Sequence, residues 1–288
     1  MLAVEQVLLL LNGKKADTMN ALTLTAIGDI LDLDRYPLDD LNSPKGKLLL
    51  ESCRAALRFE GACQLPGLVR PDAVERLIDE ATAKRDSAFK TDSSHNVYFE
   101  PLAENAPTDD PSGIVLRSSK KAIAWDLIDG DSPLRIAFEW DGLTDFIRQA
   151  MELDELYRYA DPLGAASLML YEVGDELGWH FDRSPFAVTV MLQDSVIGGD
   201  YQYFHQLRTP EDENKAGIAE RLNGSTEGLI KLVSEPGTLS MFRGQYSMHR
   251  VTPVRGFPTR INAVLAYSQK PDDVMNTLTQ KLFYGRSV

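Results

Sequence analysis

The sequence contains little cysteine, little histidine and no long hydrophobic segment. Its two cysteines, Cys53 and Cys63, form neither a CxxC pair nor a disulfide framework. We therefore expect two free thiols and a cytoplasmic location, because a reducing compartment keeps such cysteines unpaired. The apolar run at 7–11 is too short to span a bilayer and follows no basic segment, so the sequence predicts neither a transmembrane helix nor a signal peptide there.

Positive charge is also scarce. The chain has 30 Lys and Arg against 43 Asp and Glu, which gives a formal net charge of −13. A field of that sign repels phosphate backbones and anionic lipids, and no basic run overrides it. We therefore expect neither nucleic acid nor a membrane as the main partner. The sequence gives no indication of an oligomeric state.

The chain of 288 residues is long enough for one large domain. We divide it into an N-terminal extension and leader segment (1–44, with Met19 an alternative start), a helical support region (45–160) and a catalytic core (161–288). The three parts are expected to form one integrated domain. Residues 86–114 are rich in Ser, Asn, Asp and Pro, which predicts a long loop that covers the active site.

The spacing of apolar residues changes from helical to β-like after Pro162. Before it, the pattern predicts helices within 44–84 and 133–152, with short strands at 61–67 and 114–117. After it, short apolar or alternating runs separated by Gly and Pro predict strands at 166–171, 186–193, 200–204, 229–233, 238–242 and 260–267. Many short strands of this kind are typical of a double-sheet jelly roll or a barrel. We therefore predict an α+β fold, a double-stranded β-helix (jelly roll) with N-terminal helices packed against it.

Two of the four histidines stand in settings that suggest metal binding. His180 and Asp182 are two residues apart, so in an extended segment both side chains point to the same side. His249 follows 67 residues after Asp182. Two imidazoles and one carboxylate leave adjacent metal positions open, as in non-haem iron(II) oxygenases, where a 2-oxo acid and O2 bind. We predict that these three residues bind Fe(II), whereas His95 and His205 are expected in a polar loop and at the surface.

An arginine downstream of this motif extends the interpretation. Arg260 opens a predicted strand eleven residues after His249. Because a guanidinium can grip a carboxylate through two hydrogen bonds, we predict that Arg260 binds the distal carboxylate of 2-oxoglutarate. Arg255 is the alternative, but it adjoins Gly256 in a predicted turn, where we expect it to be solvated.

A family resemblance is carried by four stretches: GDELGWHFDRSPFAVTVMLQ, GGDYQYF, PGTLSMFRGQYSMHRVTPVRGFPTRINAVLAY and LFYGR. They resemble the iron(II)/2-oxoglutarate oxygenases, in the branch of free-amino-acid halogenases and hydroxylases that act on lysine and related amino acids. The resemblance covers residues 90–288 and implies a jelly roll, Fe(II), 2-oxoglutarate, O2 and a small-molecule substrate. Halogenases of this branch have Gly in place of Asp182, which leaves a position for chloride. The resemblance therefore implies hydroxylation.

The same resemblance suggests residues that bind the substrate. In the family, an Arg at this distance before the metal motif holds the substrate carboxylate, and Arg117 falls there. Taken alone, Arg117 fits a surface ion pair equally well. Arg183 departs from the acidic residue expected where an amine is recognised, which weakens the case for lysine itself, and Tyr284 is a further candidate for lining the pocket.

These observations together predict a dioxygenase that hydroxylates an unactivated C–H bond of a small molecule, with a free amino acid favoured. One alternative is an oxygenase that acts on a protein- or carrier-bound residue. Another is a jelly-roll binding module without catalysis, which predicts a broken metal motif or a missing arginine. Substrate identity and the position and stereochemistry of oxidation are not specified by the sequence.

Overall fold

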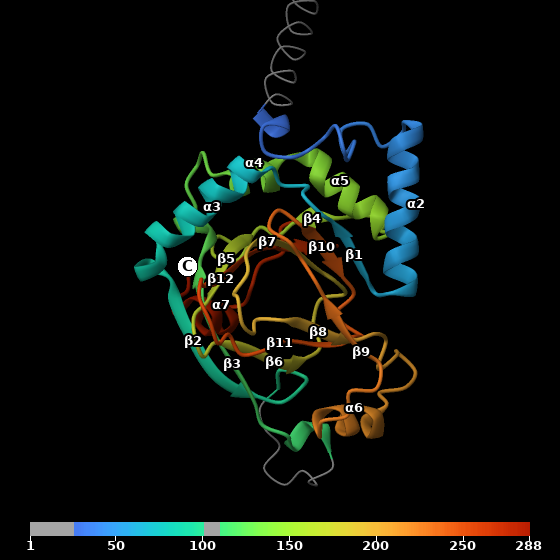
Figure 1. Cartoon of the computed structure of the whole chain (residues 1–288), viewed down its shortest axis with the longest axis vertical. Coiled ribbons are helices and arrows are strands. Elements are labelled where there is room, and N and C mark those ends of the chain that lie inside the picture. The colour runs from blue at the N-terminus through green and yellow to red at the C-terminus, as the bar shows by residue number, and fades with distance from the viewer. Residues whose placement is uncertain (1–25, 101–109) are drawn as a thin grey trace, which may run out of the picture.

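A computed structural model describes residues 26–100 and 110–288 (Figure 1). The apolar run at 7–11, Met19 and residues 101–109 of the predicted loop lie outside the described residues. Within these described ranges, no helix combines the length and the apolar character needed to cross a membrane.

In the described residues, eleven strands form one antiparallel sheet in the order β1-β10-β7-β12-β5-β3-β6-β11-β8-β9, with β2 paired to β3. Their bounds are β1 Ala62–Leu65, β2 Phe89–His95, β3 Leu116–Ile123, β5 Ala166–Tyr171, β6 Glu176–His180, β7 Ala187–Gln193, β8 Tyr201–Phe204, β9 Leu229–Leu232, β10 Leu239–Phe242, β11 Met248–Val251 and β12 Arg260–Leu265. A separate ladder joins β4 (Tyr157–Arg158) to β13 (Tyr267–Ser268).

The sheet curls until its two ends face each other (Figure 1). Tyr201 on β8 and Phe242 on β10 belong to strands near opposite ends of the strand order, yet their ring centroids are 5.3 Å apart. Strands β6, β11, β8 and β9 therefore fold over the other half of the sheet. This arrangement confirms the predicted α+β jelly roll.

Helices cover the outside of the sheet on the side of β5, β7, β10 and β12 (Figure 1). They are α2 (Pro44–Phe59), α3 (Pro71–Ala83), α4 (Pro133–Glu139) and α5 (Asp141–Ala150). Helix α2 begins where the side chain of Ser43 accepts a hydrogen bond from the amide of Gly46, and a proline occupies its first turn. Two further helices, α6 (Lys215–Leu222) and α7 (Thr277–Tyr284), lie away from this helical layer, and α7 contacts β2 and β3. We refer to the curled sheet as the barrel.

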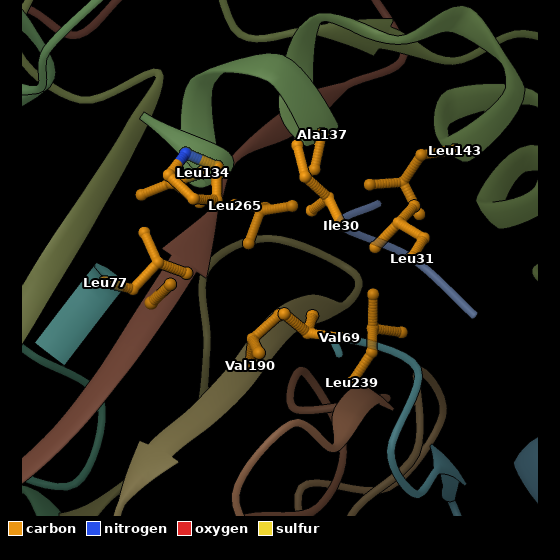
Figure 2. A pocket seen from close by; sticks show the side chains of 12 residues that line it. Ile30, Leu31, Val69, Leu77, Leu134, Ala137, Leu143, Val190, Leu239 and Leu265 are labelled. Atoms are coloured by element: carbon orange, nitrogen blue, oxygen red, sulfur yellow. The ribbon is translucent and has the colours of Figure 1, made fainter. Parts of the chain in front are cut away.

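The layer between these helices and the sheet is the main hydrophobic core. Helix α5 buries Leu143, Phe146, Ile147 and Ala150 on one face, as expected for an amphipathic helix packed on a sheet. Figure 2 shows a cavity in this layer, and its lining is apolar on every side, with Leu77, Leu134, Val190 and Leu265 among the contributors. None of its lining residues could bind a metal or donate a proton.

The predicted loop at 86–114 is wrong in part, because Phe89–His95 form strand β2. The sequence of this segment predicts a loop because Asp and Ser are poor strand formers. Pairing with β3 and burial of Thr91 and His95 outweigh that preference. Strands β1 and β3 overlap the short strands expected at 61–67 and 114–117, whereas β2 was not predicted. All three belong to the same sheet as the strands after residue 161.

Candidate metal centre

The two metal-motif histidines lie on adjacent strands, His180 at the end of β6 and His249 in β11. Asp182 follows β6, and its Oδ1 atom lies 3.7 Å from Nε2 of His180 and 3.5 Å from Nε2 of His249. One ligand atom from each of the three residues lies within 4.8 Å of the others. The structure therefore brings together the three residues that the sequence indicated.

Hydrogen bonds orient both imidazoles toward the same point. Nδ1 of His180 lies 2.8 Å from the carbonyl oxygen of Gly178, and Nδ1 of His249 lies 2.9 Å from that of Ser247. A carbonyl only accepts, so each Nδ1 carries the proton and donates it, which leaves the Nε2 lone pair free to bind a metal. Burial, and next the neighbouring His249, hold the pKa of His180 well below its usual value. His180 is therefore neutral, as a metal ligand must be.

One oxygen of the Asp182 carboxylate has no partner among the described residues, and a bound cation could interact with it. Burial opposes its ionisation, but the nearby histidines lower its pKa overall. Its Oδ2 atom is buried and has no hydrogen-bond partner among the described residues. A buried ionised oxygen without a partner is costly. Two free Nε2 atoms and one carboxylate therefore fit a divalent transition-metal ion with open coordination positions.

Gly244 packs directly against this cluster. The amide of Asp182 donates to the carbonyl of Gly244 over 3.0 Å. A Cβ atom at position 244 would lie 1.8 Å from Oδ2 of Asp182 and 3.0 Å from the His249 ring. No residue other than glycine leaves the carboxylate in its place, although nothing in the sequence distinguishes Gly244 from other turn glycines.

A pocket on the inside of the barrel contains Arg260 and lies beside the cluster. Its lining includes Thr189, Met191, Tyr201, Arg260 and Asn262. The Tyr201 ring stacks on His249 with centroids 5.6 Å apart, so one wall of this pocket touches a metal-motif residue.

Arg260 is a buried cation that forms no ion pair with the described residues. Its side chain is buried, with 4% of the residue exposed, and its Nη1 donates a hydrogen bond to Oδ1 of Asn262 over 2.7 Å. Its Nε has no partner, and no carboxylate in the described part of the chain lies within ion-pair distance. Burial lowers its pKa, although the side chain remains a cation. Burial of a cation without an ion pair is costly, so Arg260 is suited to bind a carboxylate ligand.

The segment after β2 covers the cluster. The Phe99 ring lies 4.6 Å from the His180 ring and 4.3 Å from the His95 ring. Oδ1 of Asn96 accepts from the amides of Tyr98 and Glu100, which holds this turn in shape. An aromatic side chain against a metal-motif histidine excludes water from that side.

Arg117 does not reach the cluster. Its guanidinium donates to both oxygens of Asp92 over 3.0 and 2.9 Å, to the Gly174 carbonyl over 3.0 Å and to Glu176 over 3.4 Å. The side chain is 45% exposed. The structure thus shows the surface ion pair and does not support the role in binding the substrate carboxylate.

The other two predicted substrate contacts lie in different surroundings. Arg183 is exposed and donates to the carbonyl of Phe99 over 2.8 Å, so it supports the covering segment. Tyr284 is buried on α7, where burial raises its pKa to about 12 and a hydrogen bond with Ser167 opposes that rise. It packs in an apolar cluster with Met169 and Tyr171.

His95 is not in an exposed loop, contrary to expectation. It is buried at the end of β2, with Nε2 2.6 Å from the hydroxyl of Ser118 and Nδ1 2.8 Å from the carbonyl of Asn96. His205 follows β8 in a turn and takes no part in the cluster.

Comparisons with known proteins agree with this architecture. A model of the Halogenase D family matches residues 162–283. No curated protein matches the chain. A non-haem α-ketoglutarate-dependent carbocyclase, SnoK from nogalamycin biosynthesis, has a similar solved structure, with 11% identity and a TM-score of 0.53 over 83% of this chain and 92% of that one.

Two other solved structures are similar to the same degree. The α-ketoglutarate-dependent epimerase SnoN, also from nogalamycin biosynthesis, has 12% identity and a TM-score of 0.52 over 77% of this chain and 83% of its own. AviO1 from Streptomyces viridochromogenes Tue57 has 15% identity and a TM-score of 0.51 over 77% of this chain and 96% of its own. The chain shares the fold of these proteins, and its segment similar to Halogenase D contains His180, Asp182, His249 and Arg260.

Proposed function

We propose that the protein is an iron(II)- and 2-oxoglutarate-dependent dioxygenase that hydroxylates an unactivated C–H bond of a small molecule, a free amino acid. The observation that carries the proposal is the cluster of His180, Asp182 and His249, with both Nε2 lone pairs free and one carboxylate oxygen unpartnered. The nearby buried cation, Arg260, supports 2-oxoglutarate as the co-substrate.

The residues of the chain would divide the work as follows. The two imidazoles and the Asp182 carboxylate would hold the iron, and a set of three protein ligands would leave coordination positions for 2-oxoglutarate and O2. Arg260, oriented by Asn262, pairs with the far carboxylate of 2-oxoglutarate and sets the direction in which it enters. Iron(II) and 2-oxoglutarate, when bound, supply the activation of O2 and the removal of hydrogen from substrate.

Aromatic side chains would keep the site dry. Phe99 covers His180 and Tyr201 lies against His249, so two sides of the cluster are closed to water. Positioning of one C–H bond in a dry site selects the carbon that reacts and limits side reactions.

Asp182 favours hydroxylation over halogenation. A halogenase of the resembling branch has glycine at this position, whereas the Asp182 carboxylate points at both Nε2 atoms. With that carboxylate bound, the position that a halide would need is filled. Asp182→Gly should therefore abolish hydroxylation and create a halide-binding position.

The direct test is turnover of the purified protein with iron(II), 2-oxoglutarate and O2. We expect succinate release, and a mass-spectrometric screen of the common amino acids should find one that gains a single oxygen atom. His249→Ala should abolish both signals, while His205→Ala, a histidine outside the cluster, should retain them. Succinate release that is undiminished in His249→Ala would refute the metal assignment.

A further inference from the structure

Lys120 lies on the same face of the sheet as the metal cluster. His249 and Val251 are two residues apart in β11 and share the inner face of the barrel. Val251 is the cross-strand partner of Leu177 in β6, and Leu177 is the partner of Ser118 in β3. Directly paired residues share a face, and Lys120 follows Ser118 by two positions. The Lys120 side chain therefore points into the barrel.

The other basic residues of β2 and β3 have acidic partners. Lys90 pairs with Asp175, Arg117 with Asp92 and Lys121 with Glu172. Arg117 and Lys121 are an odd number of positions from Lys120 in β3, and Lys90 is the cross-strand partner of Lys121. All three cations therefore lie on the outer face. The β2–β3 ladder therefore compensates each outward charge within the chain.

Lys120 has no such partner. Across residues 26–100 and 110–288, no ion pair or hydrogen bond reaches its ammonium group, and the nearest ring contact is Phe283 on α7, whose centroid lies 5.9 Å from Nζ. The side chain is only partly exposed, and burial lowers its pKa to about 8. At neutral pH the group is still mostly a cation. A partly buried cation without an anion costs stability unless a ligand supplies the anion.

Lys120 is also within electrostatic reach of the cluster. Burial is the main cause of the lowered pKa values of His95 and His180, and the charge of Lys120 lowers both further. The second free cation, Arg260, lines a pocket formed with residues of β7, β8 and β10. The interior therefore presents two cations on different walls, which suits two different carboxylates.

We propose that Lys120 binds a carboxylate of the substrate, so that the substrate is an anionic or zwitterionic small molecule whose carboxylate faces β3 while the carbon to be oxidised faces the metal cluster. This inference rests on the proposed function. It assigns to Lys120 the binding of the substrate carboxylate, the role that the family resemblance suggested for Arg117. Phe283 would form an apolar wall beside the carboxylate-binding position.

The test compares Lys120→Met and Lys120→Arg with Lys121→Met and Arg117→Met, two outer-face controls. Each protein is loaded without oxygen with iron(II) and 2-oxoglutarate, and the visible band of the chelate reports binding. The probes are the common L-amino acids and the amines formed by removing their carboxyl groups. We expect at least one amino acid, but not its amine, to perturb the wild-type band. Lys120→Met should raise the apparent Kd of that amino acid about tenfold or more.

The controls distinguish failure of this inference from failure of the proposed function. Lys121→Met and Arg117→Met should bind the amino acid within about twofold of wild type, since exposed ion pairs contribute little. Lys120→Arg should retain part of the affinity, and 2-oxoglutarate affinity should be unchanged in Lys120→Met. Absence of the band in the wild-type protein would contradict the proposed function and this inference together.

Other outcomes overturn the inference alone. If the wild-type protein shows a normal band, two results with Lys120→Met contradict the inference: an unchanged affinity for the amino acid, or a selective loss of affinity for 2-oxoglutarate. Two results with the wild-type protein also contradict it: no response to any amino acid, or equal binding of an amino acid and its matched amine. If Lys120→Met does not fold, loss of amino-acid binding in a folded Lys120→Arg that keeps the band would also contradict it.

Discussion

His180 and His249 are direct cross-strand partners in the β6–β11 ladder. The ladder changes register between this pair and the next, Leu177 with Val251, because β6 carries one extra residue there. The bulge lets both Leu177 and His180 face the interior. The two imidazoles are therefore held by a backbone ladder and by hydrogen bonds to carbonyls, which positions them before any metal binds.

Replacement of Gly244 by alanine should weaken metal binding without unfolding the barrel. The added Cβ would lie 1.8 Å from Oδ2 of Asp182, so the carboxylate must move. We expect the affinity for iron(II) to fall about 10- to 100-fold, as for changes that disturb the orientation of metal ligands. Anaerobic titration measures it. Gly130→Ala is the matched control, since a Cβ there meets nothing within 4 Å; equal affinities in the two variants would argue against the role of Gly244.

Replacement of Arg260 by methionine should act on the co-substrate. Loss of a charge-assisted hydrogen bond to a carboxylate should raise the Kd of 2-oxoglutarate about 10- to 100-fold. Arg255→Met removes an exposed arginine nearby in the sequence and should leave that Kd unchanged. Calorimetric titration of the iron-loaded proteins provides the measurement. The assignment of Arg260 is contradicted if the two variants behave alike.

Buried neutral histidines should make the metal-free protein sensitive to acid. The pKa values of His95 and His180 are lowered from the ordinary 6.5, mainly by burial. Below that pH the unfolded chain binds protons that the folded chain does not, so the free energy of unfolding falls as the pH falls. Urea unfolding at about pH 7.5 and about pH 5.5 should show this loss, and His95→Gln should show a smaller one. An identical loss in the variant would exclude a contribution from His95.

The pair His180 and Asp182 could be predicted from the sequence because its information is local. Residues two positions apart in an extended segment point to the same side, which indicated that His180 and Asp182 act together. His249 was indicated as the third ligand by Arg260 eleven residues later and by the family resemblance. Arg260 was predictable for a similar reason, as an arginine at the start of an apolar strand. The short β runs after Pro162 likewise indicated a jelly roll without reference to tertiary contacts.

The rest depended on register and packing. Arg117 and Lys120 are both basic residues of β3, and only the pairing of that strand with β6 decides which of them faces the interior. A shift of one residue would exchange their places. Strand β2 was hidden by its polar composition, and the close approach of Gly244 to Asp182 arises from a contact between distant segments.

The central claim is that three side chains hold one iron ion. Equilibrium dialysis against iron(II) without oxygen measures it directly, on the wild-type protein, on His180→Ala, Asp182→Ala and His249→Ala, and on His205→Ala as the control. We predict one iron per chain in the wild-type and His205→Ala proteins and a loss of tight binding in each of the other three. Full iron content in any of those three folded variants would contradict the account.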